Sequence, residues 1–165
     1  MGMVIYLRRA GDADLDRLIA DPSVFEDFLF EEGVENLDFL DLGEAWHALH
    51  YLLTGSAEDV GHPLGIIIAA LPELGADEHG EGGIGLIAPD RMLAFADALD
   101  AQDDAALARR FAPKAMAKAD VYQADALRGA DALDYVMQGV PALRQFAAQC
   151  RRTGDGAIRV IAHND

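Results

Sequence analysis

A chain of 165 residues has the length of a single domain, and its hydrophobic content of 52% is enough to build a core without disulfides or metals. Its formal net charge of −16 repels phosphate backbones and anionic lipid surfaces, so we expect neither nucleic acid nor a membrane as a partner. No apolar run approaches the ~18–20 residues that a membrane-spanning helix needs.

The acidity is distributed unevenly along the chain. Residues 1–44 carry a net charge of −9, residues 45–108 carry −10, and residues 109–165 carry +3. We therefore expect a dipolar molecule unless folding brings the basic third against the acidic parts. The composition favours a role of this acidity in solubility, and the alternative is recognition of a basic protein partner.

The first predicted element is a strand over residues 3–9, which is apolar on both faces like an inner strand covered from both sides. Helices are predicted over residues 13–20 and 24–29, where apolar residues recur at helical spacing. The next helix covers residues 44–53 and ends at a Thr-Gly pair. A proline then suits the first turn of a further helix, over the apolar run 64–71.

Residues 75–83 are rich in glycine and acidic residues, which is typical of an exposed loop. A short buried strand is predicted over residues 83–88. Pro89 is suited to begin the helix that follows, because the first turn of a helix needs no bond from its N–H. A shorter helix over residues 103–111 and a turn over residues 113–118 come next.

Pro141 interrupts a helical pattern, so we predict two separate helices over residues 131–138 and 141–152. The last element is a strand over residues 157–163, and we expect it to pair with the first strand because both are apolar. The fold class that follows is α+β (mixed α/β). We predict one helix-rich domain over residues 1–165 with a small sheet of about three or four strands.

The candidate site residues lie in one short segment, L-G-E-A-W-H-A-L-H-Y-L-L-T-G. On a helix, Trp46 and His50 share one face with two leucines, and His47, Tyr51 and Thr54 share the adjoining face. One interpretation is that Trp46 anchors the helix while His50 is a hydrogen-bonded histidine at the edge of the core. The other is a binding site in which the two histidines are acid–base groups or ligand contacts beside an aromatic wall.

A metal site is not predicted. His47 and His50 are three residues apart, whereas the zinc motif H-E-x-x-H needs four and an intervening glutamate. His62 and the acidic run 77–81 could be added, but that run is explained more simply as a solvated turn. We expect no cofactor and no metal.

Other catalytic signatures are weak. The glycine-rich segment 80–85 precedes a strand rather than opening a helix, and acidic residues surround it, so it does not match a phosphate loop. No G-x-S-x-G motif is present. The single cysteine, Cys150, falls on the apolar side of a predicted helix and is interpreted as a small buried hydrophobe. Whether the protein is an enzyme stays open.

The segment W-H-A-L-H-Y-L-L-T-G at residues 46–55 resembles the bacterial DUF1877 family, also known as YfbM-like. The resemblance extends to the Met-Gly-Met start, to the Pro-Leu pair at residues 63–64, to the helix start at Pro89, and to Gly154 before the last strand. It implies a small cytoplasmic α/β domain of unestablished function and supplies no catalytic residues. At residues 43–44 the family pattern has an acidic and then a basic residue, so no role carries over to the Gly-Glu pair found here.

Two hypotheses of function follow from these patterns. The first is a non-catalytic binding or interaction module that uses its acidic surface against a basic protein partner. The alternative is a small-molecule-binding protein or enzyme with a pocket on the helix at residues 44–55, lined by Trp46, His47, His50 and Tyr51. We expect a cytoplasmic location, because the first residues are apolar and then basic, the reverse of a secretory signal.

Overall fold

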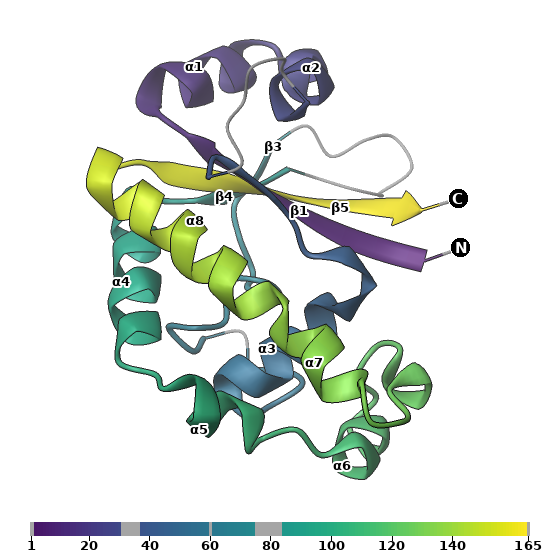
Figure 1. The fold of residues 1–165 in the computed structure, drawn as a ribbon. Helices are drawn as coiled ribbons and strands as arrows, with labels where there is room; N and C mark the ends of the chain where they lie inside the picture. The colour runs from purple at the N-terminus through teal and green to yellow at the C-terminus, as the bar shows by residue number, and fades with distance from the viewer. Residues whose placement is uncertain (1, 31–36, 60, 75–83, 165) are drawn as a thin grey trace.

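The computed structural model describes residues 2–30, 37–59, 61–74 and 84–164. The predicted exposed loop over residues 75–83 lies outside the described residues. Two long strands, β1 (Gly2–Ala10) and β5 (Gly156–Asn164), form the centre of the sheet. Their ends lie side by side, so both termini emerge at the same edge of the molecule (Figure 1).

The sheet is antiparallel, with the strand order β2-β1-β5-β4-β3. β1 and β5 pair along their whole length, from Gly2 opposite Asn164 to Ala10 opposite Gly156, which confirms the predicted pairing of the first and last strands. β4 (Ile84–Ile87) also lies where the sequence predicts a strand. The short strands β2 (Phe39–Asp41) and β3 (Glu73–Leu74) were not predicted and extend the sheet at its two edges.

Helices cover both faces of the sheet, and the predicted α+β class is confirmed (Figure 1). α1 (Asp12–Ala20) and α2 (Phe25–Leu29) lie on one face. The other face is covered by a larger group: α3 (Trp46–Thr54), α4 (Pro89–Asp100), α5 (Asp104–Ala108), α6 (Pro113–Lys118), α7 (Ala132–Met137) and α8 (Gly139–Thr153). Short 3-10 turns occupy Pro22–Val24, Gly43–Ala45 and Ala124–Ala126.

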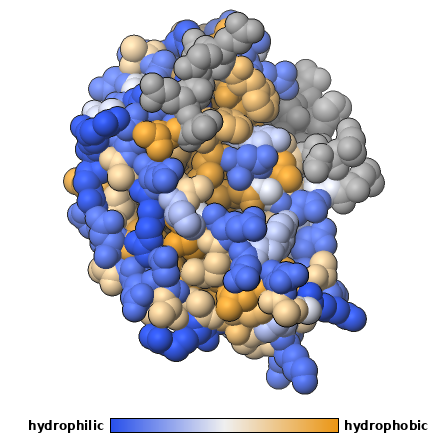
Figure 2. Space-filling model, in the orientation of Figure 1, coloured by the Kyte–Doolittle hydropathy of each residue, from blue (hydrophilic) through white to orange (hydrophobic). Residues whose placement is uncertain are grey.

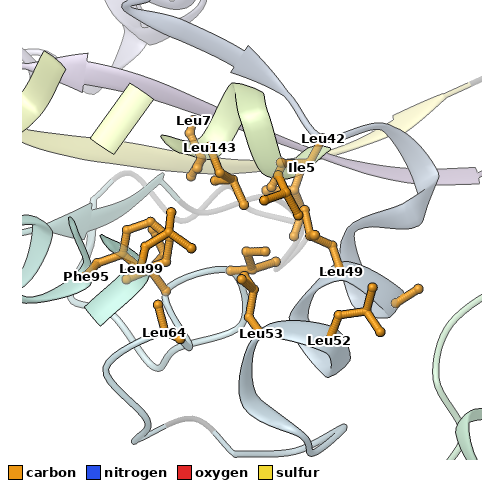
Figure 3. Close-up of a cluster of buried hydrophobic side chains, with 14 of the residues drawn as sticks. Ile5, Leu7, Leu42, Leu49, Leu52, Leu53, Leu64, Phe95, Leu99 and Leu143 are labelled. Atoms are coloured by element: carbon orange, nitrogen blue, oxygen red, sulfur yellow. The ribbon is translucent and has the colours of Figure 1, made fainter. Parts of the chain in front are cut away.

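The main core lies between the sheet and the larger group of helices. Ile5 and Leu7 of β1 point into it and meet leucines of α3 together with Phe95 of α4 and Leu143 of α8, all of them almost fully buried (Figure 3). A smaller core on the opposite face includes Leu18, Phe28 and Ile158. β1 is apolar on both faces because each face contacts one of these two cores.

The two helices predicted on either side of Pro141 are present as α7 and α8, but the second begins before the proline. α8 begins at Gly139, so Val140 is helical and Pro141 is the third residue of the helix. The first four N–H groups of a helix have no acceptor within it, and a proline in that turn therefore breaks no helical bond. The break between α7 and α8 falls at Gln138, and α8 begins at Gly139, two residues before its predicted start at residue 141.

The apolar run 64–71, predicted as a helix, is a buried segment without helical structure. The backbone carbonyls of Ile66, Ile67 and Ala69 accept hydrogen bonds from Nη1 of Arg159, at 3.2, 3.1 and 2.8 Å. Arg159 extends from the central strand β5 and is 8% exposed. The guanidinium thus satisfies carbonyls that a helix would have bonded internally.

Candidate functional site

The predicted site segment forms helix α3, as expected. Its five candidate residues lie along Trp46–Thr54, and the helix ends at Gly55, whose φ of +78° is readily adopted by glycine. The N–H of Gly55 donates to the carbonyl of Tyr51 at 2.7 Å. Arg110 adds hydrogen bonds from its Nη1 to two further carbonyls of the last turn, each 2.8 Å long. The C-terminal end of the segment is therefore firmly placed.

His47 cross-links three parts of the backbone. The N–H of Tyr122 donates to Nδ1 of His47 at 2.8 Å, so Nδ1 carries no proton and the hydrogen lies on Nε2. Nε2 in turn lies 2.8 Å from the carbonyl oxygen of Ala57 and donates to it. Both ring nitrogens are occupied by backbone partners, and a ligand would have to displace one of them.

The ring of Trp46 stacks with those of His47 and Tyr122. The ring centroids of Trp46 and His47 are 5.1 Å apart with an interplanar angle of 9°, and those of Trp46 and Tyr122 are 5.3 Å apart at 22°. Nε1 of Trp46 donates to the carbonyl of Met3, and the N–H of Met3 donates to the hydroxyl of Tyr122. This stack joins α3 to the start of β1, at Met3. Tyr122 does not lie in any sequence motif, so no signal in the sequence indicates that it belongs to this cluster.

His50 is fully buried, with 0% of its surface exposed. Nε2 lies 3.4 Å from the hydroxyl of Thr54, and Nδ1 has no hydrogen-bond partner among the described residues. Burial, with a smaller contribution from His47, lowers the pKa of His50 from its usual 6.5 to about 4. His50 is therefore neutral at physiological pH. The hydroxyl of Thr54 donates a hydrogen bond to the carbonyl of Ser56, and Tyr51 packs against the main core.

Two adjoining pockets lie next to this helix, and their lining does not include Trp46, His47, His50, Tyr51 or Thr54. The assignment of those five as binding residues stays a prediction. The first pocket has a volume of about 270 Å³ and lies between the start of α3, the loop that carries Tyr122, and α7. Its walls include Ala45, Ala48, Tyr122, Leu127 and Tyr135, with Glu44, Arg128 and Asp131 among the polar residues.

The second pocket, of about 280 Å³, lies on the other side of the turn Gly43–Ala45. It is lined by residues of β2, of the turn, of α3, of α7 and of the start of α8: Leu40, Asp41, Leu42, Leu49, Val136 and Ala142 are among them. Ala45 and Tyr135 line both pockets, and Tyr135 is 50% exposed. We call the two pockets together the Tyr135 groove.

Three of the four charged groups that line the Tyr135 groove are carboxylates, and two of these have no partner among the described residues. Glu44 is half-buried and Asp131 is exposed, and neither side chain makes a hydrogen bond or ion pair with a described residue. A Cβ on Gly2 would collide with the Glu44 carboxylate, so the bare backbone of Gly2 provides the space that this carboxylate occupies. Asp41 accepts a hydrogen bond from the N–H of Gly43. Nε of Arg128 donates to the carbonyl of Asp125.

Elsewhere, folding places the basic last third of the chain against its acidic middle. Arg144 pairs with Asp104 at 2.7 Å, and Arg151 pairs with both Asp97 and Asp100 at 2.6 Å. These contacts join α8 to α4 and α5 and reduce the dipole expected from the linear sequence. Figure 2 shows apolar patches among hydrophilic side chains on the face in view.

Among the residues that the structure describes, no three His, Cys, Asp or Glu side chains come together in a way that could hold a metal ion. Cys150 is 1% exposed, and burial raises the pKa of its thiol to about 12. No helix in the described part of the chain is long and apolar enough to cross a membrane.

Comparisons with known proteins agree with the fold. The family model described as "Domain of unknown function (DUF1877)" matches residues 1–160. Among solved structures, the chain is similar to YfbM from Escherichia coli, a protein of unknown function, with a TM-score of 0.69 and 22% sequence identity. That likeness covers 96% of this chain and 99% of the other, and at this identity it shows the fold alone. A comparison with curated proteins gave no match.

Proposed function

Since the chain belongs to the DUF1877 family, whose function is not established, we propose from its site geometry that it is a non-catalytic binding protein for a positively charged partner. The observation that carries the proposal is the Tyr135 groove. It combines an exposed tyrosine, an apolar floor and carboxylates that have no partner within the described chain. Concave sites of this composition are where proteins bind ligands.

Charge supports a cationic partner. Glu44, Asp131 and Asp41 line the groove against one basic residue, Arg128, in a protein whose net charge is −16. A half-buried carboxylate such as that of Glu44 has lost part of its hydration without gaining a partner. A bound cation would supply that partner, and the surrounding field would accelerate its approach.

Three described groups that could perform acid–base or nucleophilic chemistry are engaged elsewhere. Both nitrogens of His47 bond to the backbone, His50 is sealed in the core, and Cys150 is buried with a raised pKa. A binding function needs none of these groups, which is why we favour it over an enzymatic one.

The experiment is a titration of ¹⁵N-labelled protein with an alternating lysine–alanine peptide of ten residues, with the glutamate–alanine peptide as control. We expect the lysine peptide alone to shift backbone signals around the groove, with an affinity that falls as salt rises. The double variant Glu44→Gln/Asp131→Asn should weaken this binding. The matched variant Asp16→Asn/Asp27→Asn removes two exposed acids from α1 and α2 and should not. Equal weakening by both variants, or shifts remote from the groove, would contradict the proposal.

A second candidate is the ligand site on α3 that the sequence analysis describes. The observation that favours it is the unpartnered Nδ1 of His50, because buried nitrogens are usually bonded. Native mass spectrometry of protein purified from cells tests it. A bound small molecule would add mass that is lost in His50→Leu, whereas a mass equal to that of the bare chain in the wild type argues against this candidate.

A further inference from the structure

Resting on the proposed function, we infer that the first pocket of the Tyr135 groove takes one lysine side chain of the partner and that the second pocket takes an adjacent apolar side chain. The partner segment is therefore an extended peptide in which a lysine and an apolar residue point to the same side. The inference combines the size of the two pockets, their different chemistry and their contact at Ala45 and Tyr135.

Each pocket fits a single side chain. Sites for drug-sized ligands are commonly ~300–1,000 Å³. The two pockets, at about 270 and 280 Å³, fall below that range. Because Ala45 and Tyr135 line both of them, neighbouring side chains of one segment can enter the two pockets together. On an extended chain, side chains two positions apart point to the same face.

The first pocket matches a long cationic side chain. Ala48, Leu127 and the two tyrosines offer apolar contact for the methylene stem of a lysine. Glu44 and Asp131 offer unoccupied carboxylate oxygens to its ammonium group, and tyrosine rings attract cations further. Arg128 opposes the cation, so its charge reduces the affinity that the carboxylates provide.

The second pocket matches an apolar side chain. Leu40, Leu42 and Val136 contribute to its walls, and its carboxylate, Asp41, already accepts a hydrogen bond from the N–H of Gly43. A cation placed here would find less unused hydrogen-bonding capacity than in the first pocket. The two pockets therefore select different side chains, and this selection gives the partner segment a direction.

The test uses a seven-residue peptide, acetylated and amidated, with one lysine and one leucine two positions apart among alanines and glycines. Two matched peptides carry norleucine in place of lysine, or alanine in place of leucine. Affinities come from NMR titration of the labelled protein. We expect the norleucine peptide to bind at least about tenfold more weakly, since it forms no hydrogen bond with the charged carboxylates. The alanine peptide should bind several-fold more weakly.

Variants of the protein separate the two pockets. Ala126→Leu narrows the first pocket and should reduce the difference in affinity between the lysine and norleucine peptides. Ala142→Leu narrows the second pocket and should reduce the difference in affinity between the leucine and alanine peptides. Arg128→Gln should strengthen binding of the lysine peptide and leave the norleucine peptide unchanged. A water-soluble carbodiimide should join the lysine amine to Glu44 or Asp131, as peptide mapping by mass spectrometry would show.

The outcomes distinguish this inference from the proposed function. If the ten-residue lysine peptide binds at the groove but norleucine replaces lysine without loss in the short peptide, the lysine pocket is wrong and the binding function stands. If carbodiimide joins the peptide only to acids of α1 and α2, the lysine pocket is likewise wrong. If neither peptide shifts signals of the groove, both proposals fail.

Discussion

His50 makes the stability of this protein depend on pH in a predictable way. Its pKa is about 4 in the folded chain and 6.5 when exposed, so between these values the unfolded state binds more protons than the folded state. The free energy of unfolding must then rise with pH across this interval. The contribution of His50 is complete above pH 6.5 and is lost as the pH falls through about 4.

The magnitude follows from the two pKa values. One pKa unit corresponds to about 1.4 kcal/mol, so the full contribution is about 3 kcal/mol, and the part lost between pH 7 and pH 4.5 is about 2.4 kcal/mol. Carboxylates titrate in the same interval, and their effect must be subtracted. His50→Leu removes the titrating ring and leaves no unpaired buried polar group, so it provides that subtraction.

The assay is urea unfolding at several pH values between 4.5 and 7. We expect the unfolding free energy of the wild type, minus that of His50→Leu, to fall by about 2.4 kcal/mol as the pH falls from 7 to 4.5. Tyr51→Phe, on the same helix, keeps the histidine and should run parallel to the wild type. The ring signals of His50 should titrate in NMR near pH 4. Parallel curves for the wild type and His50→Leu would refute the reasoning, since His50 would then ionise equally in both states.

Two further predictions concern Cys150 and the turn before β5. Because burial raises the pKa of the Cys150 thiol to about 12, native protein at pH 8 should resist a thiol reagent that reacts at once in urea; rapid labelling of the native state would show that the thiol is accessible. A Cβ at Gly156 would collide with the carbonyl oxygen of Ile87, so Gly156→Ala should lower the unfolding free energy by about 3 kcal/mol. Gly154→Ala, with a φ of +72° but open space around it, should lower it by only about 1 kcal/mol in the same urea assay, and equal losses would contradict the steric argument.

The elements that the sequence predicted well are those whose signals are local. β1 is apolar at every position from Met3 to Leu7, a pattern typical of a strand that is covered on both faces. α3 has helical spacing and ends at a glycine with positive φ. The pairing of β1 with β5 followed from their apolar content, although its register did not.

The main error in the predicted elements arose where a distant residue decided the local structure. The run 64–71 has the hydrophobicity of a helix, but its carbonyls bond to Arg159, about ninety positions later, and the segment stays irregular. Around Pro141 the two predicted helices form, and only the start of the second is displaced, because a proline in the first turn of α8 breaks no helical bond.

The candidate site also divides into features set by local sequence and features set by contacts between distant residues. The sequence by itself determined the helix of Trp46–Thr54 and the overall acidity, because these depend on residue type and spacing within a few turns. The burial of His50 was one of two interpretations that the sequence left open, and the tertiary structure decided it. Only the tertiary structure decided that the N–H of Tyr122 donates a hydrogen bond to Nδ1 of His47 and that the Tyr135 groove forms beside α3. The walls of that groove come from segments that lie up to a hundred residues apart, and no periodicity of a linear chain specifies which of them will meet.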